Sequence, residues 1–152
     1  MKAINKFDFS PNFWYNRNMT RRDNLMKLKE LIQLRQILGA LANQKMSIKS
    51  SYSVARFISQ TNDAEVIYNQ KIQELINEFG IRDEQGNFKQ DENGNISIKD
   101  GVEQECNNRI AEIDNFEVET PELTIVEKDI DNLDSKIELT PAELFILLEN
   151  IK

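Results

Sequence analysis

Apolar side chains recur at spacings of three and four residues between positions 28 and 41, a periodicity typical of an amphipathic helix. The apolar face comprises Leu28, Leu31, Ile32, Leu34, Ile37, Leu38 and Leu41. Asp23 or Asn24 is placed to cap this helix, which we expect to continue to about Asn43 with a slight weakening at Gly39. The pattern therefore predicts a first helix over residues 24–43.

A second helical pattern begins after Ser47, a suitable N-cap residue, and ends at Phe79, with Gly80 placed as a C-cap. A continuous helix over residues 47–79 would be roughly 50 Å long at 1.5 Å per residue. The polar run 59–63 offers a competing interpretation, a kink or break, because Asn62 and Glu65 fit a new capping box. The short connection after residue 43 predicts that the two helices pair as an antiparallel hairpin.

Two similar turn sequences follow Gly80 at an offset of eight residues. Asp83-Glu84-Gln85-Gly86-Asn87 is echoed by Asp91-Glu92-Asn93-Gly94-Asn95, and each is followed by an apolar residue. The second turn predicts a β-hairpin around Asn93-Gly94. The acidic residues do not fit a calcium loop, because an EF-hand with Gly94 or Gly86 at its sixth position would need Asp where Lys89 or Ile81 stands.

The chemistry available to this chain is narrow. It has no histidine and a single cysteine, Cys106, so the usual zinc, haem and iron–sulfur ligand sets and an internal disulfide are excluded. Cys106 lies in a third helical pattern, residues 102–115, where we interpret it as a small core residue because no histidine is present to activate the thiol. No phosphate-binding glycine loop is present. We expect no catalytic residue, no metal ion and no cofactor.

The C-terminal third predicts short strands and a closing helix. Residues 116–119, 123–127 and 136–139 alternate or run apolar as strands do. Thr140-Pro141-Ala142-Glu143 then supplies an N-cap, a proline at the first helical position and a capping-box glutamate. The helix that follows is expected to dock on the core; the alternative is that Phe145 and Leu148 stay exposed as an apolar anchor for a partner.

These elements predict an α+β fold. It consists of an N-terminal antiparallel helical hairpin, a β-hairpin, a short helix, a small antiparallel sheet and a C-terminal helix. With 152 residues and 39% apolar content the chain is long enough for one domain with a core of its own. No stretch approaches the roughly 18 apolar residues of a membrane span, so we expect no membrane contact and a cytoplasmic setting that suits the lone thiol.

The first 24 residues differ from the rest. Five of the chain's twelve aromatic residues fall within the first fifteen positions, among Asn, Pro and positive charge and without any periodicity. We interpret residues 1–24 as a basic, aromatic arm and residues 25–152 as the single acidic domain. The arm either docks on a partner, stacks on nucleic acid or folds back over the core; alternatively, translation begins at Met19 or Met26.

Charge is divided unevenly between the two parts. Residues 1–25 carry a net charge of +3. Because the whole chain carries −7, residues 26–152 carry −10. An acidic body repels phosphate backbones, so we expect no direct nucleic-acid binding by it and look instead to a basic host protein, although solubility alone explains such a charge. Candidate partner-binding residues are Phe13, Trp14, Tyr15, Arg21 and Arg22 in the arm, and Asp83, Glu84, Asp91 and Glu92 in the turns.

Several of these segments also carry a family resemblance. The stretches 26–29 and 49–56, the helix end from Tyr68-Asn69-Gln70 to Phe79-Gly80, the Asp-Glu-x-Gly-Asn turns and residues 139–144 resemble a family of small phage and prophage proteins of low-GC Gram-positive bacteria. The resemblance covers about residues 26–152. It implies a phage setting and transfers no catalytic residues.

Two functions are expected from the resemblance together with the charge. The first is an inhibitor of host defence or nucleic-acid machinery, of the anti-CRISPR type, acting in the bacterial cytoplasm. The alternative is a virion morphogenesis factor, such as a tail or capsid accessory protein, for which the helical hairpin suits a homo-oligomer.

Overall fold

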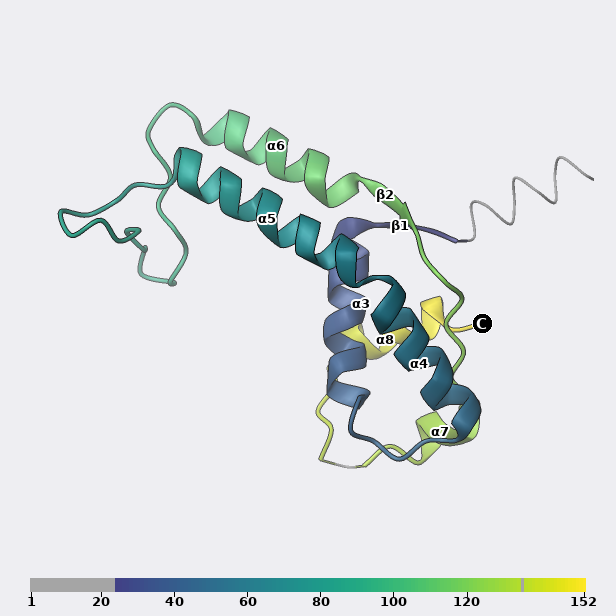
Figure 1. Ribbon diagram of the computed structural model, residues 1–152. Coiled ribbons are helices and arrows are strands. Elements are labelled where there is room, and N and C mark those ends of the chain that lie inside the picture. The colour runs from purple at the N-terminus through teal and green to yellow at the C-terminus, as the bar shows by residue number, and fades with distance from the viewer. Residues whose placement is uncertain (1–23, 135) are drawn as a thin grey trace, which may run out of the picture.

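The computed structural model describes residues 24–134 and 136–152, and within them the chain forms six helices and one two-stranded antiparallel sheet (Figure 1). The elements are β1 (Leu25–Lys27), α3 (Leu28–Leu41), α4 (Ile48–Gln60), α5 (Asn62–Phe79), α6 (Glu103–Asn115), β2 (Glu117–Glu119), α7 (Glu127–Asp131) and α8 (Pro141–Asn150). This agrees with the α+β class expected from the sequence.

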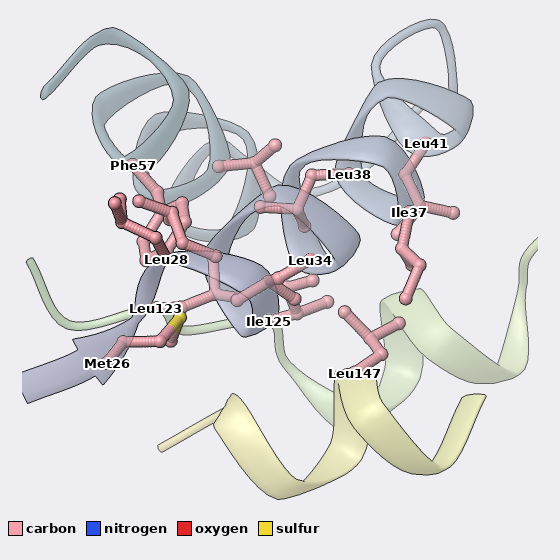
Figure 2. Packing of buried hydrophobic residues seen from close by; sticks show 12 residues of the cluster. Met26, Leu28, Leu34, Ile37, Leu38, Leu41, Phe57, Leu123, Ile125 and Leu147 are labelled. Atoms are coloured by element: carbon pink, nitrogen blue, oxygen red, sulfur yellow. The ribbon is translucent and has the colours of Figure 1, made fainter. Parts of the chain in front are cut away.

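Helix α3 is the centre of the core. Its buried residues repeat at spacings of three and four, as the sequence predicts, and comprise Leu28, Leu31, Leu34, Ile37, Leu38 and Leu41. Phe57 of α4, Leu147 of α8 and the extended residues Leu123 and Ile125 pack around this face (Figure 2). Each such side chain removed from water stabilises the fold by roughly 1.5–3 kcal/mol, so α3 holds α4 and α8 together.

The first helix begins later than the sequence indicated. Asn24 does not cap it, because residues 25–27 form β1, which pairs with β2 in the register Leu25 to Glu119 and Lys27 to Glu117. Thr120 donates its backbone N–H to Asn24 O at 2.8 Å, and Leu28 N–H donates to Phe116 O at 2.9 Å. The prediction of a helix start at residues 23–24 was wrong because the backbone of residues 24–28 is hydrogen-bonded to residues 116–120, about 90 positions away in the sequence.

The long helical pattern is divided at Thr61 into α4 and α5. Ser47 caps α4, as predicted, and its side chain accepts from Ser50 N–H. The expected capping box at Asn62 does not form: Thr61 holds the N-cap position, and its Oγ1 donates back to Phe57 O at 2.6 Å. Of the two alternatives left by the sequence, the structure contains the break.

Arg35 of α3 holds this break in place. Its Nη1 donates to Ile58 O at 2.6 Å and to Thr61 Oγ1 at 2.7 Å, while Nε donates to a Glu65 carboxylate oxygen at 2.7 Å. The Arg35 side chain is only 9% exposed. Because an interrupted helix leaves carbonyl oxygens without their usual partners, a buried guanidinium is well suited to satisfy them.

The segment between α5 and α6 contains two turns rather than one regular hairpin. Single antiparallel bridges join Arg82 to Phe88 and Gln90 to Ile96, so the predicted hairpin around Asn93-Gly94 is present as one bridge only. Backbone bonds from Lys89 N–H to Ile81 O and from Ser97 N–H to Lys89 O link the repeats at the eight-residue interval. These bonds tie each repeat to the next.

Helices α5 and α6 run side by side and extend away from the rest of the molecule (Figure 1). They have a small core of their own, in which Leu75, Phe79 and Cys106 are buried. The interpretation of Cys106 as a core residue is confirmed. Tyr68 of α5 donates to an Asp114 carboxylate oxygen at 2.9 Å, and this bond joins the two helices at the end nearer α3.

The C-terminal third has fewer strands than predicted. Of the three expected strands only the first forms, as β2, and it pairs with β1 rather than with its C-terminal neighbours. Leu123 makes a single parallel bridge to Ile151, residues 136–139 contain no strand, and the unpredicted helix α7 begins at Glu127. The reason is that residues 123–126 lie against α4, where side chains rather than a neighbouring strand satisfy their N–H groups.

Serines of α4 provide those partners. Ser53 Oγ accepts from Thr124 N–H at 2.7 Å, and Ser50 Oγ accepts from Val126 N–H at 2.9 Å. Asp129 of α7 in turn accepts from the Ser47 backbone N–H at 3.0 Å and from the hydroxyls of Ser47 and Ser50. These hydrogen bonds hold the pKa of Asp129 below its usual range. A carboxylate from α7 therefore completes the N-terminal cap of α4.

The closing helix forms as predicted. Thr140 accepts from Glu143 N–H at 3.2 Å, Glu143 accepts from Thr140 N–H at 2.8 Å, and Pro141 occupies the first turn. Leu147 is fully buried against the core. At the other end, Lys152 N–H donates to Leu123 O at 2.8 Å. Helix α8 is thus fixed at both ends and along one face.

Candidate partner-binding surfaces

No catalytic constellation is found among the described residues 24–134 and 136–152. Within them, no group of three or more acidic or cysteine side chains is arranged to hold a metal ion, and every buried side-chain nitrogen or oxygen has a hydrogen-bond partner. The buried polar groups Arg35 and Asp129 stabilise local backbone. In the same part of the chain, no helix is both long and apolar enough to cross a membrane.

The acidic turns lie at the end of the α5–α6 pair farthest from α3 (Figure 1). Asp83 Oδ1 accepts from the N–H groups of Gln85 and Asn87, and Asp91 Oδ1 accepts from those of Asn93 and Asn95. Bonds to the Asn95 backbone and side chain lower the pKa of Asp91. Both aspartates therefore stabilise their own turns.

The two glutamates of these turns are placed differently. Glu84 and Glu92 are exposed, one beside each aspartate, and no hydrogen bond or ion pair involves their side chains within the described residues. The structure thus brings all four predicted acidic residues to one end of the molecule, and it leaves the glutamates as the carboxylates best able to contact a partner.

The other predicted partner-binding residues lie in the arm. Phe13, Trp14, Tyr15, Arg21 and Arg22 fall outside the described residues, so the structure places none of them.

Helix α8 presents an apolar surface to solvent. Its buried face is occupied by Leu147, whereas Leu144, Phe145 and Leu148 are 36%, 61% and 50% exposed. We call these three residues the α8 ridge. Leu148 is a neighbour of both others on the helix surface, because it follows Leu144 by four residues and Phe145 by three. The expectation that this helix docks on the core is confirmed. Phe145 and Leu148 nevertheless stay exposed, and their role as an anchor for a partner stays a prediction.

Helix α8, which carries the α8 ridge, is itself acidic. Helix α8 contains Glu143 and Glu149 and no basic residue, and the exposed Glu138 precedes it in the chain. Contiguous apolar side chains with a charged rim are typical of protein-binding sites, whereas single exposed apolar residues are not. The α8 ridge thus combines exposed apolar side chains with negative charge on the same helix.

A second apolar surface lies where α3, α5 and α6 meet. It is a shallow groove of about 300 Å³ lined by Leu28, Ile67, Lys71, Glu112, Ile113 and Phe116, and we call it the Phe116 groove. Phe116 and Ile67 are 61% and 52% exposed. The sequence did not reveal this groove, because its walls come from three segments, and Phe116 was interpreted only as the start of a strand.

Comparison of the chain with protein-family models, curated proteins and solved structures finds no match. The resemblance to phage proteins accordingly remains an expectation from the sequence.

Proposed function

We propose that this chain is a non-enzymatic phage protein that binds a basic bacterial protein and blocks it, as an inhibitor of host defence or nucleic-acid machinery of the anti-CRISPR type. The observation that carries the proposal is the α8 ridge on an acidic body. Leu144, Phe145 and Leu148 offer apolar contact, and the −10 charge of residues 26–152 attracts a positively charged surface.

The rigidity of α8 supports this role. Its capping box fixes the first turn, Leu147 anchors the middle, and the bond from Lys152 N–H to Leu123 O fixes the end. A binding surface that is already held in place loses little conformational entropy when a partner docks. The ridge is therefore suited to stoichiometric binding, as an inhibitor requires.

Protein capture from host lysate with matched variants tests the proposal. The immobilised chain is expected to retain a basic host protein, and Phe145→Ser with Leu148→Ser should weaken that interaction about 30-fold or more, the effect of losing a binding hot spot. Ile48→Ser is the control, because Ile48 is an exposed apolar residue on a different helix, α4, and lies in neither the α8 ridge nor the Phe116 groove.

The captured protein must then lose activity when the chain is added at equal molar amount, and high salt must weaken the complex because it screens charge attraction. Failure to recover a host protein would count against the proposal, as would equal retention by the ridge variant and the wild type.

A second candidate is a virion accessory protein that associates with copies of itself. The specific observation in its favour is the outer face of α4, where Lys49, Tyr52 and Arg56 are exposed and no acidic residue lies within the helix. This basic face and the acidic α8 are different surfaces of one chain. Such complementary surfaces allow head-to-tail association into rings or filaments.

A mass measurement in solution distinguishes the two candidates. The virion candidate predicts a ring or filament that dissociates in high salt and in the variant Lys49→Glu with Arg56→Glu, together with presence of the protein in purified particles. A monomer that captures a host protein through the α8 ridge favours the inhibitor.

A further inference from the structure

The Phe116 groove holds its largest side chain in an exposed position. Phe116 N–H donates to Ile113 O at 3.3 Å, and Phe116 O accepts from Leu28 N–H at 2.9 Å. The residue is therefore fixed between the end of α6 and the start of α3 and does not fold inward. Together with Ile67 of α5 it leaves an apolar surface facing solvent, and surfaces of this kind are usually covered by a partner.

The chain's own N-terminal segment is attached close to this groove. Residues 1–23 lie outside the described part of the chain and join it at Asn24, directly before β1. β1 pairs with β2, which begins at the residue after Phe116. The attachment point is therefore about four residues along the ladder from Phe116, or roughly 13 Å. Ten extended residues reach about 33 Å, so Trp14 is within reach of the groove.

The chemistry of this segment matches the groove. It contains the consecutive aromatic residues Phe13, Trp14 and Tyr15, followed by Arg17, Arg21 and Arg22. The exposed charges around the groove and along the adjoining strand are mainly acidic: Glu112, Glu117 and Glu119. Of the two nearby lysines, Lys71 is paired with Glu74, and Lys27 lies opposite Glu117 in the sheet. Apolar contact inside the groove and opposite charges at its edge thus fit the same segment.

We infer that the Phe116 groove is the docking site of the chain's own aromatic segment, residues 13–15, with the arginines that follow contacting the acidic rim. The inference does not depend on the partner proposed for the α8 ridge. A tethered segment has an effective concentration near the millimolar range, so weak contacts suffice to keep it docked. A second copy at micromolar concentration competes poorly with it.

Trp14 is the only tryptophan in the chain and therefore reports docking directly. In the 152-residue chain its fluorescence is expected to be blue-shifted and protected from acrylamide, and both properties should be independent of protein concentration. Phe116→Ser, and separately Ile67→Ser on the opposite wall, should shift the emission to the red and increase quenching several-fold. Phe145→Ser, which removes an equally exposed phenylalanine from α8, should change neither.

Circular dichroism of each variant verifies that the fold is retained, and two variants on separate helices keep the test valid if one of them unfolds. Solvent-like Trp14 emission in the wild type would overturn the inference. So would protected emission that neither groove variant changes, or protection that appears only as protein concentration rises, which would identify a second copy as the occupant.

Discussion

Arg35 Nη1 donates to Thr61 Oγ1 at 2.7 Å, at the point where one helical pattern becomes two helices. Thr61 is 2% exposed, so its hydroxyl and the neighbouring Ile58 carbonyl have little access to water as an alternative partner. Through this contact α3, the centre of the core, determines where α4 ends and α5 begins. Arg35 therefore fixes α5 relative to α3, together with Ala64 and Tyr68, which pack against the core around α3.

Replacing Arg35 by alanine is expected to lower the free energy of unfolding by about 2–3 kcal/mol, because hydrogen bonds from a charged donor are lost and buried acceptors are left unpaired. Urea denaturation followed by circular dichroism measures the change. Lys71→Ala is the control: its ion pair with Glu74 is exposed on both sides, so its removal should change the free energy by less than about 0.5 kcal/mol. Equal effects of the two variants would contradict the role given to Arg35.

Two glycine-to-alanine variants should have opposite effects. Gly39 lies within α3 with open space where a Cβ would be placed, so Gly39→Ala should stabilise the protein by roughly 0.5–1 kcal/mol. At Gly80 an added Cβ would lie 2.5 Å from Ile76 O and 2.9 Å from the Phe88 ring, so Gly80→Ala should destabilise it. Thermal unfolding of both variants tests this pair, and a change of the same sign in both would refute it.

Asp129 should make stability depend on pH in the acid range. Its pKa is lowered in the folded state by bonds from Ser47 and Ser50. A carboxyl of this kind stabilises the fold above its unfolded pKa, about 3.9, and the stabilisation is lost as pH falls toward the folded pKa. The gap in unfolding free energy between the wild type and Asp129→Asn should be largest near neutral pH and narrow below about pH 4. If the unfolding free energies of the wild type and Asp129→Asn changed in parallel with pH, Asp129 would contribute nothing to the pH dependence of stability.

Ser50→Ala tests the same network from its other side. Ser50 is fully buried, and its hydroxyl joins Asp129 to Val126 N–H, so we expect a loss of roughly 1–3 kcal/mol from the groups left unpaired. Ser51→Ala is the neighbouring control, because Ser51 is exposed and its hydroxyl bond to Met46 O is long at 3.4 Å. If Ser50→Ala and Ser51→Ala unfolded at the same urea concentration, the hydrogen bonds of Ser50 would not contribute to the stability of the fold.

Cys106 should react slowly in the folded protein. The thiol is 3% exposed between α5 and α6, and burial raises its pKa, which lowers the fraction of reactive thiolate. Alkylation by iodoacetamide, followed by mass spectrometry, should be much faster in urea than in buffer. A native rate equal to that in urea would show that the cysteine is accessible.

Local sequence signals predicted the elements that depend on neighbouring residues. The capping box of Thr140 and Glu143, the Ser47 cap and the buried position of Cys106 are all found in the structure. Each can be read from a short window, because cap residues bond within one helical turn and helical periodicity is local.

Long-range contacts determined what the sequence did not reveal. Residues 25–27 fit the helical pattern in the sequence, but in the structure they pair with β2. The break at Thr61 is held by Arg35, which lies 26 positions earlier. The Phe116 groove is likewise formed by three separated segments. The sequence identified Phe145 and Leu148 of the α8 ridge as apolar residues of a helix. It did not predict their exposure, because that depends on which face of α8 the core buries.

The division of the apolar interior into two clusters sets the order in which the molecule opens. Leu75, Phe79 and Cys106 form the smaller cluster, apart from the twelve buried residues around α3. Regions with few buried contacts exchange their amide hydrogens through local unfolding, below the free energy of the global transition. We therefore expect the far ends of α5 and α6 to exchange their amide hydrogens before α8 and its ridge do.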